Sequence, residues 1–291
     1  MTDRLTLDQV NALDAEDFAE TFAAIYEDSP WVARWAAALR PFSSLTALAR
    51  GLADVVAAAD RDSRLTLLSA HPDLAGRAAL AGKVTRDSHH EQASAGLDSL
   101  IRAEMDRFTA SNDRYRQRFG FPFILAVKHW SKDEILAAFD GRLANDAATE
   151  MATALAEVDK IAFSRLLDRV VPAATGRLTT HVLDTARGCP AAGVPVTLER
   201  IEKGETALVR QTVTNADGRL DQPLLAGAEM TAGRWRLTFA AGAYFLASGQ
   251  RLSAPAFLDR IPLCFAIANP EQHYHVPLLV SPWSFSTYRG S

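Results

Sequence analysis

A chain of 291 residues, 48% hydrophobic and 23% charged, has the length of about two globular domains of roughly 150 residues each. Its formal net charge of −4 gives no electrostatic reason to bind nucleic acid or an acidic membrane. No apolar run is long enough to span a bilayer, and the start lacks the layout of a secretory signal. Cys189 and Cys264 make no disulfide framework, which favours the cytoplasm, although one disulfide between them stays open.

The first part of the chain, up to about Val171, has the apolar spacing of consecutive amphipathic helices. Capping-box sequences at Thr6 and at Ser131 mark two helix starts. Gly141 is expected to end the helix that follows Ser131, and Asn145 to cap a long last helix. Further helical stripes fall in residues 14–26, 44–59, 65–70 and 91–108. This pattern predicts an all-α domain over residues 1–172.

Residues 171–176 separate this part from one with a different period. Short segments rich in β-branched and aromatic residues follow, with turn sequences such as Asn215–Gly218 and Asn269-Pro270 between them. The expected strands are residues 178–183, 194–200, 208–214, 234–239, 261–267 and 274–280. Short strands separated by turns are typical of a sandwich, so we predict an all-β domain over residues 177–291.

Several residues of the helical part have chemistry that could serve a site, although each has an ordinary structural explanation. His71 precedes Pro72, which forces it to a helix end, where a histidine is most often a turn residue. Ser88 and Glu91 have the spacing of a capping box. Arg165 lies one turn after an apolar position and would most often extend its charge to solvent. Taken singly, none of these residues identifies a function.

Taken together, they form an ordered set of motifs. The set comprises His71-Pro72-Asp73-Leu74-Ala75-Gly76, Glu91-Gln92, Phe119-Gly120-Phe121-Pro122-Phe123-Ile124, and Glu157-Val158 followed by Lys160-Ile161 and Arg165-Leu166. Over most of residues 5–171 the chain resembles the decarboxylases of 2-oxo-4-hydroxy-4-carboxy-5-ureidoimidazoline (OHCU). The resemblance implies an all-helical, cofactor-free enzyme that forms (S)-allantoin. Loss of CO2 leaves charge that the imidazolone ring delocalises, so the chemistry requires neither a metal nor an electron-sink cofactor.

The resemblance also implies roles for single residues. His71 would be the acid or base, because an imidazole titrates near neutral pH. Glu91 and Gln92 would hydrogen-bond the ureido and ring N–H groups, and Arg165 would hold an anionic oxygen of the substrate. The other residues expected at the substrate are Pro72, Ser88, Phe123 and Ile124. The neighbouring His89 and His90 lie outside the motif and are expected to be solvated.

In the β part, three histidines stand where imidazoles could share one site. His273 and His275 fall on one face of an expected strand, because side chains alternate along a strand, and His181 falls on another strand. The ordinary explanation is that His181 is satisfied by a neighbour and that Arg219, after the Asn215–Gly218 turn, is a solvated charge. The three imidazoles could also bind zinc, but no acidic or thiol ligand accompanies the histidine pair.

The β part carries a second resemblance, to the 5-hydroxyisourate hydrolases, the transthyretin-related enzymes of the uric acid pathway. It rests on Thr180-His181-Val182-Leu183-Asp184, Asn215-Ala216-Asp217-Gly218-Arg219, His273-Tyr274-His275-Val276-Pro277-Leu278-Leu279, Ser281-Pro282-Trp283-Ser284-Phe285-Ser286-Thr287 and Tyr288-Arg289-Gly290-Ser291. The resemblance spans residues 177–291 and implies a transthyretin-like sandwich. One departure is Ala243, where the family usually has Asp.

This second resemblance implies a hydrolytic site without a cofactor or a metal. His181 and His275 would position and deprotonate a water, and Arg219 would stabilise the oxyanion that develops on the substrate. Tyr288 and Ser291 would close or orient the site. The resemblance also implies a homotetramer, because in this family four subunits meet to form the pockets.

Both resemblances in one chain predict a bifunctional enzyme whose partners are two small molecules rather than nucleic acid or membrane. The second domain would hydrolyse 5-hydroxyisourate to OHCU, and the first would convert OHCU to (S)-allantoin. The alternative is a transthyretin-like protein that binds a small ligand, with only one active domain. The last residues, Arg289-Gly290-Ser291, are no peroxisomal signal, which favours a cytoplasmic enzyme of bacterial type.

Overall fold

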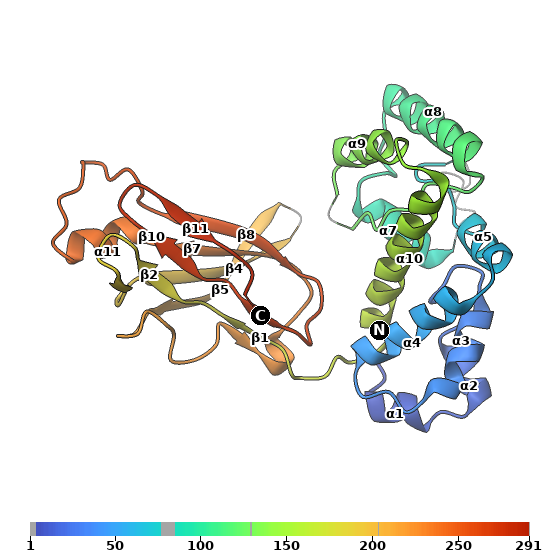
Figure 1. Ribbon diagram of the computed structural model, residues 1–291, viewed down its shortest axis with the longest axis horizontal. Helices are drawn as coiled ribbons and strands as arrows, with labels where there is room; N and C mark the ends of the chain where they lie inside the picture. Colours follow the sequence, from blue (N-terminus) through green and yellow to red (C-terminus); the bar gives the residue numbers. More distant parts are fainter. Residues whose placement is uncertain (1–3, 77–84, 129, 203, 291) are drawn as a thin grey trace. The chain divides into compact units, whose positions relative to one another are not determined.

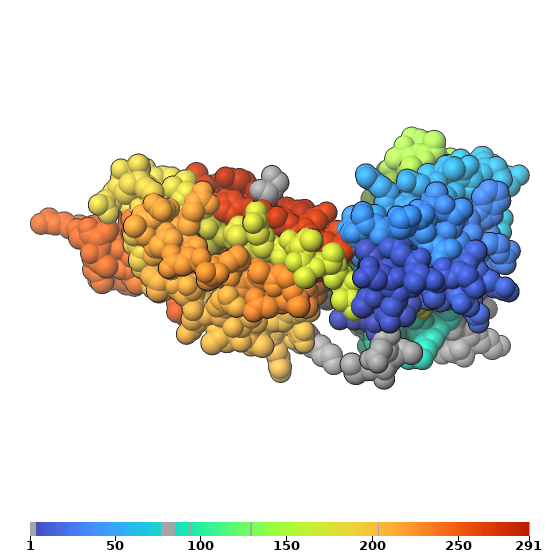
Figure 2. Space-filling view, turned by 90° about the horizontal axis from the view of Figure 1, so that it is seen from below, coloured from blue at the N-terminus to red at the C-terminus, as the bar shows by residue number. Residues whose placement is uncertain are grey.

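The computed structural model describes residues 4–76, 85–128, 130–202 and 204–290. The chain forms two compact units, one that ends at Val171 and one that begins at Pro172. Helices build the first unit and strands most of the second, which confirms the fold class expected from the change of period (Figure 1). Figure 2 shows the outer surface of the same two units, with the helical unit in blue to green and the β unit in yellow to red. In the described ranges, no helix is both long and apolar enough to cross a membrane.

The helical unit follows the predicted capping chemistry. Its elements are α1 (Leu7–Ala12), α2 (Ala15–Thr21), α3 (Pro30–Ala36), η1 (Ala37–Leu39), α4 (Leu45–Ala58), α5 (Arg61–Ser69), α7 (Arg86–Ser94), α8 (Arg102–Phe119), α9 (Lys132–Arg142) and α10 (Ala147–Arg169). Thr6 and Ser131 make the expected capping boxes. Two expectations were wrong by a residue or two, since Asp146 rather than Asn145 caps α10 and Gly141 lies inside α9.

The expected helix over residues 91–108 is divided in two. Helix α7 ends at Ser94 and α8 begins at Arg102, because Gly96 takes a left-handed backbone (φ 71°) between them. Helix α7 also starts earlier than expected, with the Thr85 side chain accepting from the Ser88 N–H. Ser88 is therefore a buried residue inside the first turn, so the ordinary explanation that it caps a helix was wrong.

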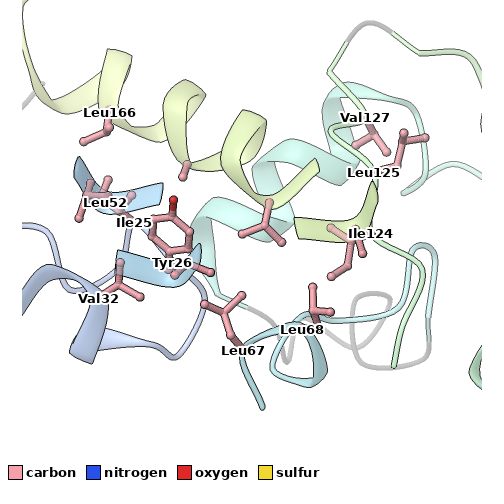
Figure 3. Close-up of a cluster of buried hydrophobic side chains, with 14 of the residues drawn as sticks. Ile25, Tyr26, Val32, Leu52, Leu67, Leu68, Ile124, Leu125, Val127 and Leu166 are labelled. Carbon is pink, nitrogen blue, oxygen red and sulfur yellow. The ribbon is translucent and has the colours of Figure 1, made fainter. Parts of the chain in front are cut away.

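The core of the helical unit supports one irregular strip of chain, residues 121–128. Leu67 and Leu68 at the end of α5 are completely buried, and Ile124, Leu125 and Val127 of the strip are nearly so. Figure 3 shows these side chains in one cluster with Tyr26 and Leu166. The segment after α5 and the strip are thus held on the same core.

The β unit is a sandwich of two layers. Its elements are β1 (Arg177–Thr179), β2 (Val182–Asp184), β3 (Cys189–Pro190), β4 (Pro195–Glu202), β5 (Glu205–Val213), β6 (Leu225–Ala226), η2 (Gly227–Glu229), β7 (Gly233–Phe239), α11 (Ala241–Ala247), β8 (Ile261–Ile267), β9 (His273–His275), β10 (Leu278–Val280) and β11 (Phe285–Thr287). One layer has the order β5-β4-β7-β8, and the other contains β6-β1-β9 and β11-β10-β2-β3. Four of the six expected strands form as single strands and the other two are each divided in two, whereas α11, which carries the exposed Ala243, was not expected.

The expected strands over residues 178–183 and 274–280 are each divided in two, and the two breaks lie side by side in the sheet. Strand β1 pairs in parallel with β9, and β2 with β10, on either side of the break. Pro277 has no N–H with which to continue the ladder, so the two strands bend together there. Hydrogen bonds still cross the break, from Val276 N–H to the Thr179 carbonyl (2.9 Å) and from Leu278 N–H to the His181 carbonyl (2.8 Å). This shared bend brings His181 and His275 to one place.

Candidate active sites

His71 lies in a cleft of the helical unit, just after the end of α5. Its N–H donates to the Leu68 carbonyl (3.2 Å), and its Nδ1 lies 3.0 Å from the Leu67 carbonyl oxygen. A carbonyl only accepts, so Nδ1 carries the proton and Nε2 of the neutral ring keeps its lone pair. Burial lowers the pKa of His71, although the Leu67 carbonyl and the charge of Glu27 oppose it. His71 is therefore a neutral imidazole at neutral pH.

Six of the eight residues expected in the helical site line this cleft: His71, Pro72, Ser88, Glu91, Gln92 and Ile124. Phe123 and Arg165 do not. The Phe123 ring stacks on Phe139 inside the core, with ring centroids 3.8 Å apart. Only its main chain could therefore reach a ligand. Lys128 and Lys160 also line the cleft, although sequence reasoning did not select either lysine.

The cleft wall made by residues 124–128 is fixed from behind by two carboxylates. The Ile124 carbonyl accepts from Nη1 of Arg142 (2.5 Å), and Arg142 is paired with Glu150, which is completely buried. The Ala126 N–H donates to Oε2 of Glu157 (2.9 Å). These bonds hold the irregular main chain in place where no helix or strand does so.

Arg165 lies behind Glu91 instead of facing the cleft. Its Nε and Nη2 donate to Oε1 and Oε2 of Glu91 (2.9 and 3.0 Å), and Nη2 also donates to Glu27 (2.8 Å). Its Nη1 donates to the carbonyls of Ala24 and Ile25 (3.3 and 3.4 Å). Arg165 is 3% exposed as a residue, and its guanidinium is thus fully engaged by the protein. Its direct contact with a substrate stays a prediction.

Glu27 belongs to this arrangement and was missed by sequence reasoning. Its carboxylate accepts from Thr85 Oγ1 (2.5 Å), Ser88 Oγ (2.9 Å) and Arg165. Burial alone would raise the pKa of Glu27, but the Thr85 hydrogen bond and the Arg165 charge outweigh it and lower the pKa. The one signal in the sequence is an acidic residue two positions after Ile25, where the apolar stripe ends.

The two polar residues expected to bind the ureide differ in their surroundings. Burial raises the pKa of Glu91, more than its ion pair with Arg165 lowers it, and the charge of Glu27 adds to the rise. Oε1 of Gln92 accepts from the Ala75 N–H (2.9 Å), so its NH2 end is the one that would serve a ligand. The same bond holds Ala75, whose φ of 53° is unusual for a residue with a side chain.

The second group of candidate residues meets at the bend of the β unit. The turn that contains Gly218 packs so closely on β2 that an added Cβ would lie 2.3 Å from the Val182 carbonyl oxygen. Arg219 follows Gly218, and its main chain forms an isolated antiparallel β-bridge with His181. Arg219 lines a groove together with Arg177, Thr179, His273 and His275. The structure therefore brings the candidate guanidinium to the same groove as the histidine pair.

Three neutral imidazoles surround this groove or lie beside it. The pKa values of His181 and His275 are lowered by burial and then by the charge of Arg219, and the pKa of His273 is lowered by burial and then by Arg177. Nε2 of His181 is buried and has no hydrogen-bond partner in the described part of the chain. Neutral imidazoles next to guanidinium groups suit removal of a proton from water and stabilisation of an anion.

The last described residues lie against His275. The Gly290 N–H donates to the His275 carbonyl (2.8 Å), and a Cβ added to Gly290 would lie 3.0 Å from Cδ2 of the imidazole. Tyr288 is 59% exposed, and Ser291 lies outside the described residues. Among the residues that the structure describes, no group of three or more His, Cys, Asp or Glu side chains could hold a metal ion.

Comparison with known proteins assigns the two units to two families. Residues 11–167 match the family model for OHCU decarboxylase, and residues 178–290 match that of the HIUase/Transthyretin family. The crystal structure of an (S)-allantoin synthase is 41% identical, has a TM-score of 0.84, and is matched over 99% of this chain and 100% of its own.

Single-function relatives each match one unit. An OHCU decarboxylase of Haloferax volcanii is 48% identical over 57% of this chain and 96% of its own. A 5-hydroxyisourate hydrolase of Pseudomonas aeruginosa is 53% identical over 41% of this chain and 95% of its own. The two relatives therefore divide the chain between them.

Proposed function

Because this chain belongs to the OHCU decarboxylase family over residues 11–167 and to the HIUase/Transthyretin family over residues 178–290, we propose that it is a bifunctional enzyme of uric acid degradation. The β unit hydrolyses 5-hydroxyisourate to OHCU, and the helical unit decarboxylates OHCU to (S)-allantoin. The observation that carries the proposal is that each unit holds its own imidazole site, one around His71 and one around His275.

Hydrolysis uses the neutral imidazoles at the bend. His181 and His275 take a proton from a water that attacks the ring carbonyl of 5-hydroxyisourate. The charge that develops on the carbonyl oxygen is stabilised by Arg219. The ring C–N bond then breaks, and the leaving nitrogen takes the proton back. Tyr288 and Ser291 would orient the substrate from the end of the chain.

Decarboxylation uses the cleft beside α5. Glu91 accepts hydrogen bonds from N–H groups of OHCU, and the NH2 group of Gln92 donates to an oxygen of the substrate. Arg165 holds Glu91 in position. The bond to the carboxylate carbon breaks, CO2 leaves, and the electron pair is delocalised over the ring. In the same step Nε2 of the neutral His71 takes the proton of the substrate's 4-hydroxyl group. The imidazolium then delivers this proton to one face of the ring, which makes the product a single enantiomer. Pro72, Ser88, Ile124 and the main chain at Phe123 shape the cleft.

We also propose a homotetramer that forms through the β unit. Apolar side chains are exposed on β5 and β11, with Leu208 at 60% and Phe285 at 45%, and their burial between subunits would stabilise an assembly. Sedimentation of the full-length protein tests this proposal, because a monomer would contradict it.

Two free cysteines support a cytoplasmic location.

The test of the proposed function is stereochemical. Urate and a urate oxidase supply 5-hydroxyisourate in place, ultraviolet absorbance follows its loss, and circular dichroism follows the chiral product. The wild-type protein should accelerate both steps and give one enantiomer. His71→Ala should leave only the hydrolysis, and His275→Ala should leave only the decarboxylation when a separate hydrolase supplies OHCU. Racemic allantoin formed at the rate seen in buffer would refute the proposal, and binding without turnover would favour a carrier.

A further inference from the structure

The hydroxyl of Thr179 lies between two imidazoles of the β unit. Oγ1 is 2.8 Å from Nε2 of His273 and 2.9 Å from Nδ1 of His275. Thr179 faces His275 directly across the parallel pair β1 and β9, so the three side chains share one face of this sheet. Neither the family assignment nor the sequence motifs give Thr179 or His273 a role.

Counting protons restricts what these three groups can do. A hydroxyl has one hydrogen, so Thr179 donates to one imidazole and accepts from the other when both rings are neutral. In the first arrangement, His275 carries its proton on Nδ1 and donates to Thr179, and Thr179 donates to His273. In the second arrangement, His273 donates to Thr179, and Thr179 donates to Nδ1 of His275. In the first arrangement Nε2 of His275 has a lone pair, and in the second it carries a proton. Only the first arrangement makes His275 a base.

We propose that Thr179 is a positioning residue that keeps the proton of His275 on Nδ1, with His273 as the acceptor at the other end. This proposal rests on the hydrolase function proposed above. Nδ1 of His275 is occupied by Thr179, so Nε2 is the nitrogen left to meet a water. The main chain at Gly290 lies against the same ring, so closely that an added Cβ would be 3.0 Å from Cδ2 of His275.

Burial and the charges around the three groups favour neutral imidazoles, which is the condition for this proton count. Arg177 on β1 and Arg219 after the Gly218 turn both disfavour a positive charge on the imidazoles, and His181 adds to this effect at His275. Arg289 faces the other way, over the ring of Tyr274 at 4.4 Å. If His273 gained a proton in acid, it would donate to Thr179, and Thr179 would then donate to His275. The lone pair on Nε2 would be lost, so protonation of His273 would switch off the base.

The experiment compares Thr179→Val, which keeps the shape and removes the hydroxyl, with Thr179→Ser, which keeps the hydroxyl. Thr212→Val, on β5, serves as a control outside the groove. Solid-state ¹⁵N NMR of the histidine-labelled full-length protein reads the tautomer directly, and His273→Gln and His275→Gln assign the signals among seven histidines. The wild type and Thr179→Ser should show His275 protonated at Nδ1, whereas Thr179→Val should show Nε2 protonated or a mixture.

Turnover gives the second measurement. Thr179→Val should lower kcat for hydrolysis of 5-hydroxyisourate by roughly ten- to a hundredfold with little change in KM, since it changes a base and not a binding group. Thr179→Ser should stay within about threefold of the wild type, and decarboxylation by the same chain should be unchanged. Equal hydrolysis rates for the Val and Ser variants, or His275 protonated at Nε2 in the wild type, would overturn the proposal. A wild-type protein without hydrolase activity would refute the proposed function, and the NMR signals would still decide the tautomer.

Discussion

Arg165 and Glu91 form a two-point ion pair, with Nε 2.9 Å from Oε1 and Nη2 3.0 Å from Oε2. The same guanidinium also pairs with Glu27, so one positive charge is shared by the buried carboxylate of Glu27 and the partly exposed carboxylate of Glu91. Glu27 has the lowered pKa and Glu91 the raised one. The pair is thus unequal, and the carboxyl that faces the cleft is the one that more readily holds a proton.

Glu27→Gln tests whether this sharing matters for catalysis. The change removes one charge and keeps the size, so the hydrogen bond of Arg165 to residue 27 weakens and Glu91 is less well held. We expect kcat/KM for decarboxylation to fall by up to about a hundredfold, because small displacements in a site are costly. The free energy of unfolding should fall by about 1–3 kcal/mol. Circular dichroism of the product and urea unfolding measure the two effects.

Glu20→Gln is the matched control for this variant. Glu20 is an exposed carboxylate of α2, a few residues before Glu27. Its substitution should change the unfolding free energy by less than about 0.5 kcal/mol and leave decarboxylation unaltered. If Glu27→Gln behaves in the same way as Glu20→Gln, Glu27 does not position Arg165.

The pH profile of decarboxylation should report the environment of His71. Its pKa is lowered from 6.5 by burial, so the neutral form persists when the pH falls below 6.5. If the neutral ring is the active form, kcat/KM should stay level from pH 8 down through 6.5 and decline only at lower pH. As the pH falls, His71 gains a proton in the unfolded chain before it does so in the folded one. The free energy of unfolding should therefore decrease once the pH is below the unfolded-state pKa. An acidic decline centred at or above 6.5 would contradict this assignment.

The helical fold was predictable where capping residues and apolar stripes agree, as at Thr6 and Ser131. Prediction failed at residues 95–101, because the apolar stripe of residues 91–108 continues across a turn. There the left-handed backbone of Gly96, and not a change of pattern, ends the helix. A hydrophobic stripe records which side chains meet the core, and two helices packed on one core produce a similar stripe.

The candidate sites were predictable only in part. Sequence motifs located His71 and His275, but Glu27 and Thr179 depend on neighbours far along the chain. Glu27 meets Arg165 across 138 positions, and Thr179 meets His275 across 96. No local pattern encodes such a contact. Arg165 shows a different case, since a motif selected it for the substrate, whereas in the structure it pairs with Glu91 and with Glu27, which no motif indicates.

Glu150→Gln should destabilise the cleft wall. Glu150 is completely buried and accepts from Arg142, Asn145 and Tyr115, and Arg142 in turn holds the Ile124 carbonyl. Removing the carboxylate leaves the Arg142 charge uncompensated in the interior, which costs about 3–5 kcal/mol. Urea unfolding should show this loss, and KM for OHCU should rise because the strip near Ile124 loosens.

Glu104→Gln provides the comparison for Glu150. Glu104 pairs with Lys132 at 3.0 Å, but its side chain is 27% exposed. A pair in contact with water contributes less than about 1 kcal/mol, so this variant should unfold close to the wild type. Equal losses for the two variants would show that burial of Glu150 does not set the cost.

Gly290→Ala should impair hydrolysis and leave decarboxylation intact. A Cβ at position 290 would lie 3.0 Å from Cδ2 and 3.2 Å from Cβ of His275, so the imidazole or the last strand must shift by a few tenths of an ångström. We expect kcat for 5-hydroxyisourate to fall roughly tenfold, because the ring loses its alignment with Thr179. Gly141→Ala is the control, since nothing lies within 4 Å of its added Cβ and its helix tolerates alanine. An unchanged hydrolysis rate in Gly290→Ala would mean that the end of the chain does not hold His275.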